Sequence, residues 1–167
     1  MPGELWPAAG ALRWRMVTDG VMGGVSRGSI TEQTVAGCSA VRMRGQVSTD
    51  NNGGFIQIAL DLAPDGGAID ASGFSGVIID VFGNDESYGA HLRSTDLFRP
   101  QQSYRQEFDA PPRWTTIQLP FSQFTPHRTD APLNLARLRR IGLVAIGREF
   151  DVDLSVARLA LYCSAQA

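Results

Sequence analysis

Histidine, cysteine and carboxylate side chains are the groups with which this sequence could perform acid–base or metal chemistry. Its two histidines, His91 and His127, lie at no metal-ligand spacing from each other or from a cysteine or carboxylate cluster. Asp50, Asn51 and Asn52 are suitable calcium ligands by type, but so few carboxylates together do not make a tight site. We therefore expect neither a metal nor a cofactor.

The sequence contains none of the usual motifs for nucleophilic catalysis or phosphate binding. There is no Gly-x-Ser-x-Gly sequence, and all 15 basic residues are arginine, which excludes a Walker-type loop and a catalytic lysine. Five carboxylates fall in turns or at strand ends, where two could face each other as in a glycosidase: Asp19, Asp50, Asp80, Asp85 and Glu86. Because aspartate is a common turn residue, a structural role is favoured and no catalytic residue is assigned.

The glycine-rich segment DGVMGGVSRG, residues 19–28, is the first candidate for a binding loop. Its spacing differs from the Gly-x-Gly-x-x-Gly dinucleotide fingerprint. Adjacent glycines permit a positive φ and close backbone approach, which suits a ligand loop and equally a packed connection between strands. We expect Asp19 to brace this loop through backbone N–H groups, and we count among its candidate binding residues Asp19, Met22, Gly23, Gly24 and Ser26.

A second glycine pair follows in TDNNGGFIQ, residues 49–57. Asn-Gly is a typical hairpin-turn dipeptide, so a simple turn is the structural alternative. Two Asp-led loops with paired glycines are nevertheless unusual, and they add Asn52, Gly53 and Gly54 to the candidate surface.

Aromatic and arginine side chains supply the remaining candidates. Tyr88, Tyr104 and Trp114 offer stacking faces, although such residues in strands are more often part of the core. Arg93 and Arg105 offer bidentate donors, and we expect them to line a loop end or a neighbouring strand face.

The elements that must position these residues have a period of two. Alternating or continuous apolar patterns predict about ten short strands, at 11–17, 29–36, 40–47, 55–62, 76–83, 88–94, 103–110, 114–121, 141–147 and 151–162. Turn residues separate them, and the single helical candidate is 133–140, at most two turns long. This pattern predicts an all-β fold, a single jelly-roll β-sandwich of antiparallel strands spanning residues 1–167.

Composition restricts the partners and the compartment. A net charge of −2 gives no field that would attract nucleic acid. No apolar stretch is long enough to span a bilayer, and the first residues do not resemble a signal peptide, so we expect a cytoplasmic protein without a transmembrane segment. Cys38 and Cys163 are expected to be free, mostly buried thiols rather than a disulfide.

In their order along the chain, these motifs resemble the complex I intermediate-associated protein family. The resemblance spans nearly the whole chain and rests on Asp19, Met22, Gly23, Gly24 and Ser26, then Gly45, Asn52, Gly53, Gly54 and Phe55, then Tyr88, Arg93, Trp114, Pro120, Phe121 and Phe124. It implies a galactose-binding-like sandwich and, for the mitochondrial members, a role in assembling respiratory NADH:ubiquinone oxidoreductase. Small stand-alone members such as this chain look bacterial.

Three functions follow as hypotheses. The favoured one is a non-catalytic binding module used as a protein-assembly or chaperone factor, with a protein partner such as a respiratory complex subunit. The alternative is a carbohydrate- or small-ligand-binding module, which this sandwich fold commonly supports. A carboxylate-dependent hydrolase comes third.

Overall fold

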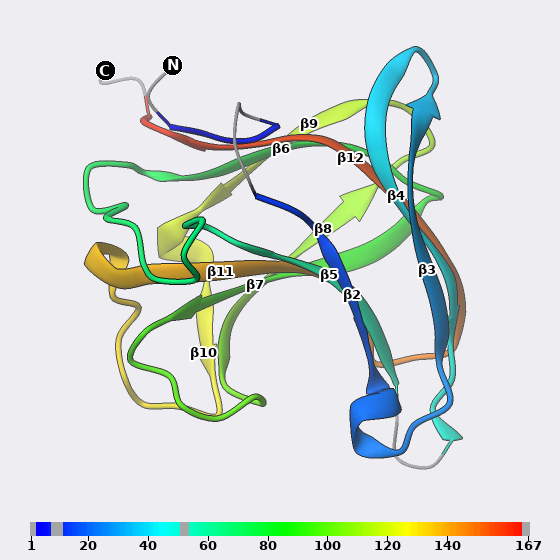
Figure 1. Ribbon diagram of the computed structural model, residues 1–167, viewed down its shortest axis with the longest axis horizontal. Coiled ribbons are helices and arrows are strands. Elements are labelled where there is room, and N and C mark those ends of the chain that lie inside the picture. Colours follow the sequence, from blue (N-terminus) through cyan, green and yellow to red (C-terminus); the bar gives the residue numbers. More distant parts are fainter. Residues whose placement is uncertain (1–2, 8–11, 51–53, 165–167) are drawn as a thin grey trace.

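The computed structural model describes residues 3–7, 12–50 and 54–164 and consists of two antiparallel β-sheets packed face to face (Figure 1). The strands are β1 (Glu4–Trp6), β2 (Arg15–Thr18), β3 (Arg27–Val35), β4 (Cys38–Val47), β5 (Phe55–Asp61), β6 (Gly76–Phe82), β7 (Glu86–Ser94), β8 (Ser103–Ala110), β9 (Thr115–Pro120), β10 (Thr125–His127), β11 (Leu138–Ile146) and β12 (Phe150–Tyr162).

Each sheet has six strands. Sheet A has the order β3-β4-β12-β6-β9, with β1 paired to Leu159 and Ala160 of β12, and sheet B has the order β10-β8-β7-β11-β5-β2. Some neighbours in each sheet are distant in sequence: β12 lies between β4 and β6, and β11 lies between β7 and β5. Sheet B thereby combines segments from between residues 15 and 146 on one face.

Alternation along the strands decides which side chains enter the core. In β5, Ile56, Ile58 and Leu60 point between the sheets and are fully buried, while Gln57 and Asp61 point outward. The β11 partners of this inward row are Leu143 and Ile141, also buried. Burying one aliphatic side chain of this kind contributes about 1.5–3 kcal/mol, so a slip of one residue in register would be very costly.

The helical prediction for 133–140 was wrong. Only Leu135–Arg137 form a short 3-10 helix, η4, and Leu138 already belongs to β11. Leu138 is fully buried and its backbone is paired with Ile69, so long-range pairing overrides the local helical preference. The described ranges contain twelve strands. The prediction of about ten strands did not include the two short edge strands β1 and β10.

Two further expectations are corrected. Cys38 and Cys163 are free, as predicted, but both are exposed: Cys38 follows the turn of the β3–β4 hairpin and Cys163 follows the end of β12. Trp114 lies outside the core cluster, half-buried beside Phe82, and its Nε1 donates to the carbonyl of Val35 at 2.9 Å. Nothing in the described ranges is a helix long and apolar enough to cross a bilayer.

Candidate functional site

The first glycine loop is organised around one buried carboxylate. Asp19 opens the 3-10 helix η1 (Asp19–Met22) directly after β2 and is 0% exposed. Its Oδ1 accepts the backbone N–H of Ser26 at 3.0 Å, and its Oδ2 accepts the Ser26 hydroxyl at 2.5 Å. The same Oδ2 accepts the backbone N–H groups of Gly54 at 2.6 Å and Phe55 at 3.2 Å. We call these four residues the Asp19 brace.

The brace holds a charge inside the protein. Burial by itself would raise the pKa of Asp19, but the hydrogen bonds from Ser26, Gly54 and Phe55 outweigh it and keep the pKa below its usual value. The Ser26 hydroxyl oxygen also accepts the backbone N–H of Ser48 at 2.8 Å. The carboxylate is therefore fully occupied in joining two loops and has no free edge for a ligand.

Two adjacent glycines in this loop are required for different reasons. Gly23 ends η1 with φ of +84°, in the left-handed region that favours glycine. Gly24 has no such φ, but a Cβ there would lie 2.4 Å from Asp19 Cγ. The loop thus combines a conformational glycine with a steric one that lets the backbone approach the brace.

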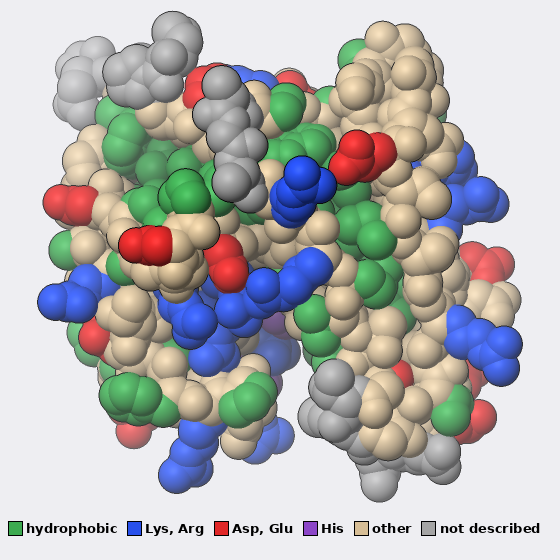
Figure 2. All heavy atoms as spheres, viewed as in Figure 1, with side chains coloured by type: hydrophobic (Ala, Val, Ile, Leu, Met, Phe, Trp, Pro, Cys, Tyr) green, Lys and Arg blue, Asp and Glu red, His purple; other side chains and the backbone are tan. Residues whose placement is uncertain are grey.

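A different surface, the outward face of sheet B, carries a shallow trough. Across β7 and β11, Gly89 faces Val144 and Gly142 faces His91, and of the two glycines Gly89 lines the trough. The trough has a volume of about 560 Å³ and is lined by Ser87, Tyr88, Gly89, His91, Arg105, Gln106, Glu107, Gln123, Thr125, Val144 and Ile146. Basic side chains gather over β7, β11 and β10 (Figure 2), and since the chain has no lysine they are arginines.

Half-buried basic residues lie in the trough and directly beside it. Burial, with smaller effects from the charges of Arg105 and His127, lowers the pKa of His91 to about 3, so its imidazole is neutral at physiological pH. Burial and the nearby Arg128 lower the pKa of Arg105. Next along β7, the pKa of Arg93 is lowered by burial and by Arg140 and Arg139. The arginines among these groups are partly desolvated, and their charges repel one another.

The residues that the sequence analysis selected divide among three places. Asp19, Gly23, Gly24, Ser26 and Gly54 belong to the brace and its loop. Arg93 and Arg105 lie on the outward face of sheet B, which agrees with the strand-face position expected for them.

The remaining selected residues lie elsewhere. Tyr88 is 2% exposed, and its ring packs against Phe108 and Phe150 between the sheets. Tyr104 is buried as well. The side chain of Met22 and all of Asn52 and Gly53 fall outside the described residues. The expected single loop-end surface is therefore replaced by a brace, a core position and a sheet face.

Sequence reasoning missed His91 and Glu107 as trough residues. The alternation in 103–110 does place Arg105 and Glu107 opposite the buried Tyr104 and Phe108. The missing information was the pairing of Arg105 with His91 across β8 and β7. Only that register shows that the two groups share a face.

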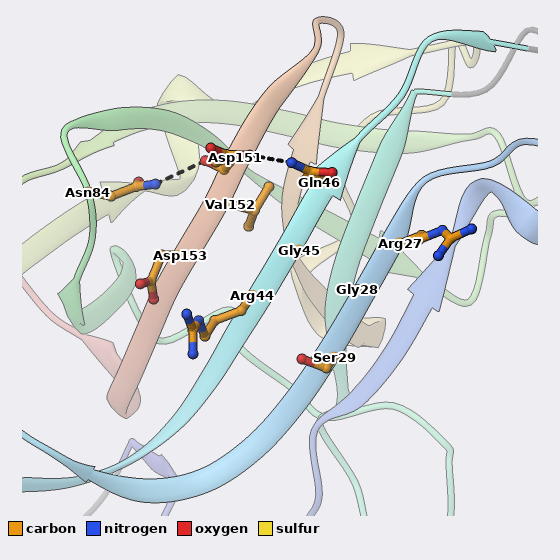
Figure 3. Close-up of a pocket in the computed structure, with 10 residues that line it drawn as sticks. All are labelled: Arg27, Gly28, Ser29, Arg44, Gly45, Gln46, Asn84, Asp151, Val152 and Asp153. Carbon is orange, nitrogen blue, oxygen red and sulfur yellow. Dashed lines mark hydrogen bonds between the residues drawn. The ribbon is translucent and has the colours of Figure 1, made fainter.

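A second hollow of about 670 Å³ lies on the outward face of sheet A (Figure 3). Figure 3 shows Gln46 and Asn84 reaching Asp151 from two sides, and they donate to its Oδ1 at 2.9 Å and to its backbone carbonyl at 3.0 Å. Asp153 is held by Arg42 through two hydrogen bonds of 2.8 and 2.6 Å. Because its acidic groups are already paired, this hollow is the weaker candidate.

Metal chemistry has no visible support on either face. Within residues 3–7, 12–50 and 54–164, no three His, Cys, Asp or Glu side chains are grouped closely enough to hold a metal ion.

Comparison with known proteins supplies a family and a fold. The family model described as Complex I intermediate-associated protein 30 (CIA30) matches residues 4–156. Among curated proteins, none matches the chain significantly.

Several solved structures are similar in fold. One is a family 11 carbohydrate-binding module from Clostridium thermocellum in complex with a β-1,3-1,4-mixed-linked tetrasaccharide, with a TM-score of 0.77 and 16% identity over 99% of this chain and 97% of that one. Another is the family 30 carbohydrate-binding module of a cellulosomal cellulase from Clostridium thermocellum, with a TM-score of 0.63 and 10% identity over 83% of this chain and 84% of that one. These likenesses confirm the predicted all-β jelly-roll sandwich.

Proposed function

The chain belongs to the complex I intermediate-associated protein 30 family, and from this premise we propose that it is a non-catalytic binding module used in protein assembly. The observation that carries the proposal is the trough on sheet B. Its lining includes Gly89 and the half-buried Arg105, which has no acidic partner in the described part of the chain. A half-buried charge without a partner is costly in the free protein, and a bound partner would relieve that cost.

The roles of the carboxylates support a binding rather than a hydrolytic function. Asp19 is enclosed in the brace. Asp80, on the outward face of sheet A, accepts the hydroxyl of Thr116 at 2.7 Å, and Glu86 is paired with Arg148. Asp85 occupies a turn with φ of +65°. The carboxylates of Asp19, Asp80 and Glu86 thus have partners within the protein, which favours structural roles over a catalytic pair.

The family description points to a protein partner, and we propose a subunit of a respiratory complex in the cell of origin. The test is affinity capture from that cell with three baits: the unchanged protein, Arg105→Glu and Arg44→Glu. Arg44 carries the same charge on β4, on the opposite face of the sandwich. Subunits of one complex should be recovered with the unchanged protein and Arg44→Glu and lost with Arg105→Glu. Equal recovery with all three baits would contradict the trough as the binding surface.

Carbohydrate binding is the second candidate, and the observation that favours it is the combination of a sheet-face trough with a fold shared by carbohydrate-binding modules. A glycan array probed with the same three proteins distinguishes it from assembly. A glycan retained by the unchanged protein and Arg44→Glu but lost by Arg105→Glu would favour carbohydrate binding at this trough.

A further inference from the structure

Two arginines on the outward face of sheet B have unused donors. Arg93 makes all three of its hydrogen bonds through Nη1, to the backbone carbonyls of Arg99, Pro100 and Gln102. Arg105 uses only Nε, which donates to the hydroxyl of Ser103 at 2.8 Å. Within the described residues, Nη2 of Arg93 and both Nη groups of Arg105 therefore have no acceptor, and they are the atoms that bind carboxylates in a fork geometry.

No acidic side chain neutralises these two arginines. All 17 aspartates and glutamates of the chain lie within the described ranges, and the five ion pairs found there involve other arginines. Asp61, the nearest acidic residue on β5, is shared by Arg140 at 2.7 Å and Arg15 at 3.2 Å. Arg105 in the trough and the adjoining Arg93 therefore carry uncompensated positive charge.

The surrounding side chains add to this charge. Arg128 lies close enough to Arg105 to lower its pKa, and Arg139 and Arg140 do the same to Arg93. Glu107 is the one acidic side chain that lines the trough; it is exposed and follows Arg105 by two residues on β8. The positively charged part of the surface therefore ends at Glu107.

Apolar side chains lie at both ends of this basic surface. Phe98 is 89% exposed in the β7–β8 loop, whose backbone is fixed by Arg93 and by Gln102, which accepts the N–H groups of Phe98 and Arg99 at 3.2 and 3.1 Å. At the other end Ile146 is 40% exposed. Arg140, which faces Arg93, is six positions before Ile146 on β11, or about 20 Å along a strand.

The trough is poorly suited to a neutral glycan. Tyr88 and Tyr104 both point into the core, and Trp114 lies on the outward face of sheet A. Among the described residues that line the trough, none presents an exposed tryptophan or tyrosine ring on which a sugar could stack.

From this arrangement we propose that the trough, together with the adjoining Arg93 and Phe98, binds an extended acidic segment of a protein. The carboxylates of the segment pair with Arg93 and Arg105, and its apolar residues contact Phe98 and Ile146. The inference rests on the proposed binding function and specifies the chemistry of the partner. An extended segment of about six residues covers the distance along β11. Charge complementarity selects the segment, and Phe98, on a loop held by hydrogen bonds from Arg93 and to Gln102, gives it an apolar anchor.

The test uses a fluorescein-labelled peptide of alternating glutamate and valine, about eight residues long so that it overhangs both ends. The matched control peptide has glutamine in place of glutamate. The unchanged protein should bind the glutamate peptide at least about tenfold more tightly than the glutamine peptide, because charge-assisted hydrogen bonds are the stronger kind. Raising the salt from about 50 mM to about 500 mM should remove most of this difference.

Four variants locate the binding. Arg105→Gln and Arg93→Gln should each weaken the glutamate peptide by about tenfold, and Glu107→Gln should strengthen it because a repulsive charge is removed. Arg44→Gln, on sheet A, should change nothing. Far-UV circular dichroism and thermal unfolding of each variant show whether it is folded.

Three outcomes would overturn the inference: equal binding of both peptides, no binding of the glutamate peptide at low salt, or equal weakening by Arg44→Gln and Arg105→Gln. A fourth would be displacement of the peptide by polygalacturonate at a lower carboxylate concentration than by unlabelled peptide, which would indicate an acidic glycan instead. If the peptides fail while Arg105→Glu still abolishes capture or glycan binding, the trough remains the binding surface and only the acidic segment is refuted. If Arg105→Glu changes neither capture nor glycan binding, the proposed function itself fails.

Discussion

Asp19 Oδ2 accepts the backbone N–H of Gly54 at 2.6 Å, which links the end of β2 to the residue that precedes β5, 35 positions later. The same carboxylate holds Ser26, so the two glycine loops are joined through one buried charge. The two glycine loops, which carry part of the family resemblance, thus have a structural role: they stabilise one end of the sandwich.

We expect Asp19→Asn to destabilise the protein by about 3 kcal/mol or more. An asparagine would present an NH₂ group to backbone donors, and each buried donor left without an acceptor costs about 1–3 kcal/mol. Urea unfolding followed by circular dichroism measures the change. Asp50→Asn is the control, since Asp50 is exposed, and it should stay within about 0.5 kcal/mol of the unchanged protein. Equal stability of the two variants would contradict the brace.

Alanine substitutions should separate the two glycines of the first loop. Gly24→Ala should cost about 1–3 kcal/mol, because its Cβ would lie 2.4 Å from Asp19 Cγ and the brace would have to shift. Gly23→Ala should cost about 1 kcal/mol, because only its left-handed φ is unfavourable and the space is open. Gly73→Ala, with open space and no positive φ, is the control. A Gly24→Ala protein as stable as Gly73→Ala would refute the steric role.

Tyr88→Phe should lower stability without changing ligand binding. The Tyr88 hydroxyl donates to Asn84 Oδ1 at 2.6 Å and accepts the backbone N–H of Asp153 at 3.1 Å, and burial raises its pKa to about 12. The loss of both hydrogen bonds should lower the free energy of unfolding, measured by thermal unfolding, by about 1–3 kcal/mol. Unchanged affinity for the glutamate peptide would confirm that Tyr88 acts in the core, whereas lost affinity in a fully folded variant would contradict it.

The neutral His91 should make the protein less stable in mild acid. Its pKa is lowered from an ordinary value of 6.5 to about 3, so between these values the unfolded chain binds a proton that the folded chain does not. The contribution of the neutral His91 to the free energy of unfolding is complete above about pH 6.5 and is lost progressively as the pH falls toward 3. Urea unfolding from neutral pH to pH 4.5 should show a shallower loss for His91→Gln than for the unchanged protein. A His91 resonance that titrates near its ordinary pKa in NMR spectra would refute this.

Both cysteines should react in the folded protein. Cys38 and Cys163 are exposed and unpaired, so a thiol reagent such as dithiobis-nitrobenzoate should label two sites without denaturant. Reaction of Cys38→Ser and Cys163→Ser at one site each assigns the signal. A protein that reacts only after unfolding would contradict the exposed positions.

Much of the fold could be predicted from the sequence because its causes are local. The alternation in 55–62 and 103–110 gave both the strands and their buried faces, since successive side chains point to opposite sides of a sheet. The 133–140 segment failed for the opposite reason: Leu138 pairs with Ser94 and Ile69, and that pairing is invisible to a local pattern.

For the candidate site, the sequence by itself determined the residue types: the glycine loops, the arginines without lysines, and the strand face on which Arg105 alternates with buried aromatics. Only the tertiary structure decided which of them meet. It buried Asp19 under two loops, placed Tyr88 in the core and set His91 beside Arg105. The physical reason is that strand order and register join residues far apart in the chain, and burial, pairing and charge repulsion depend on those joined neighbours.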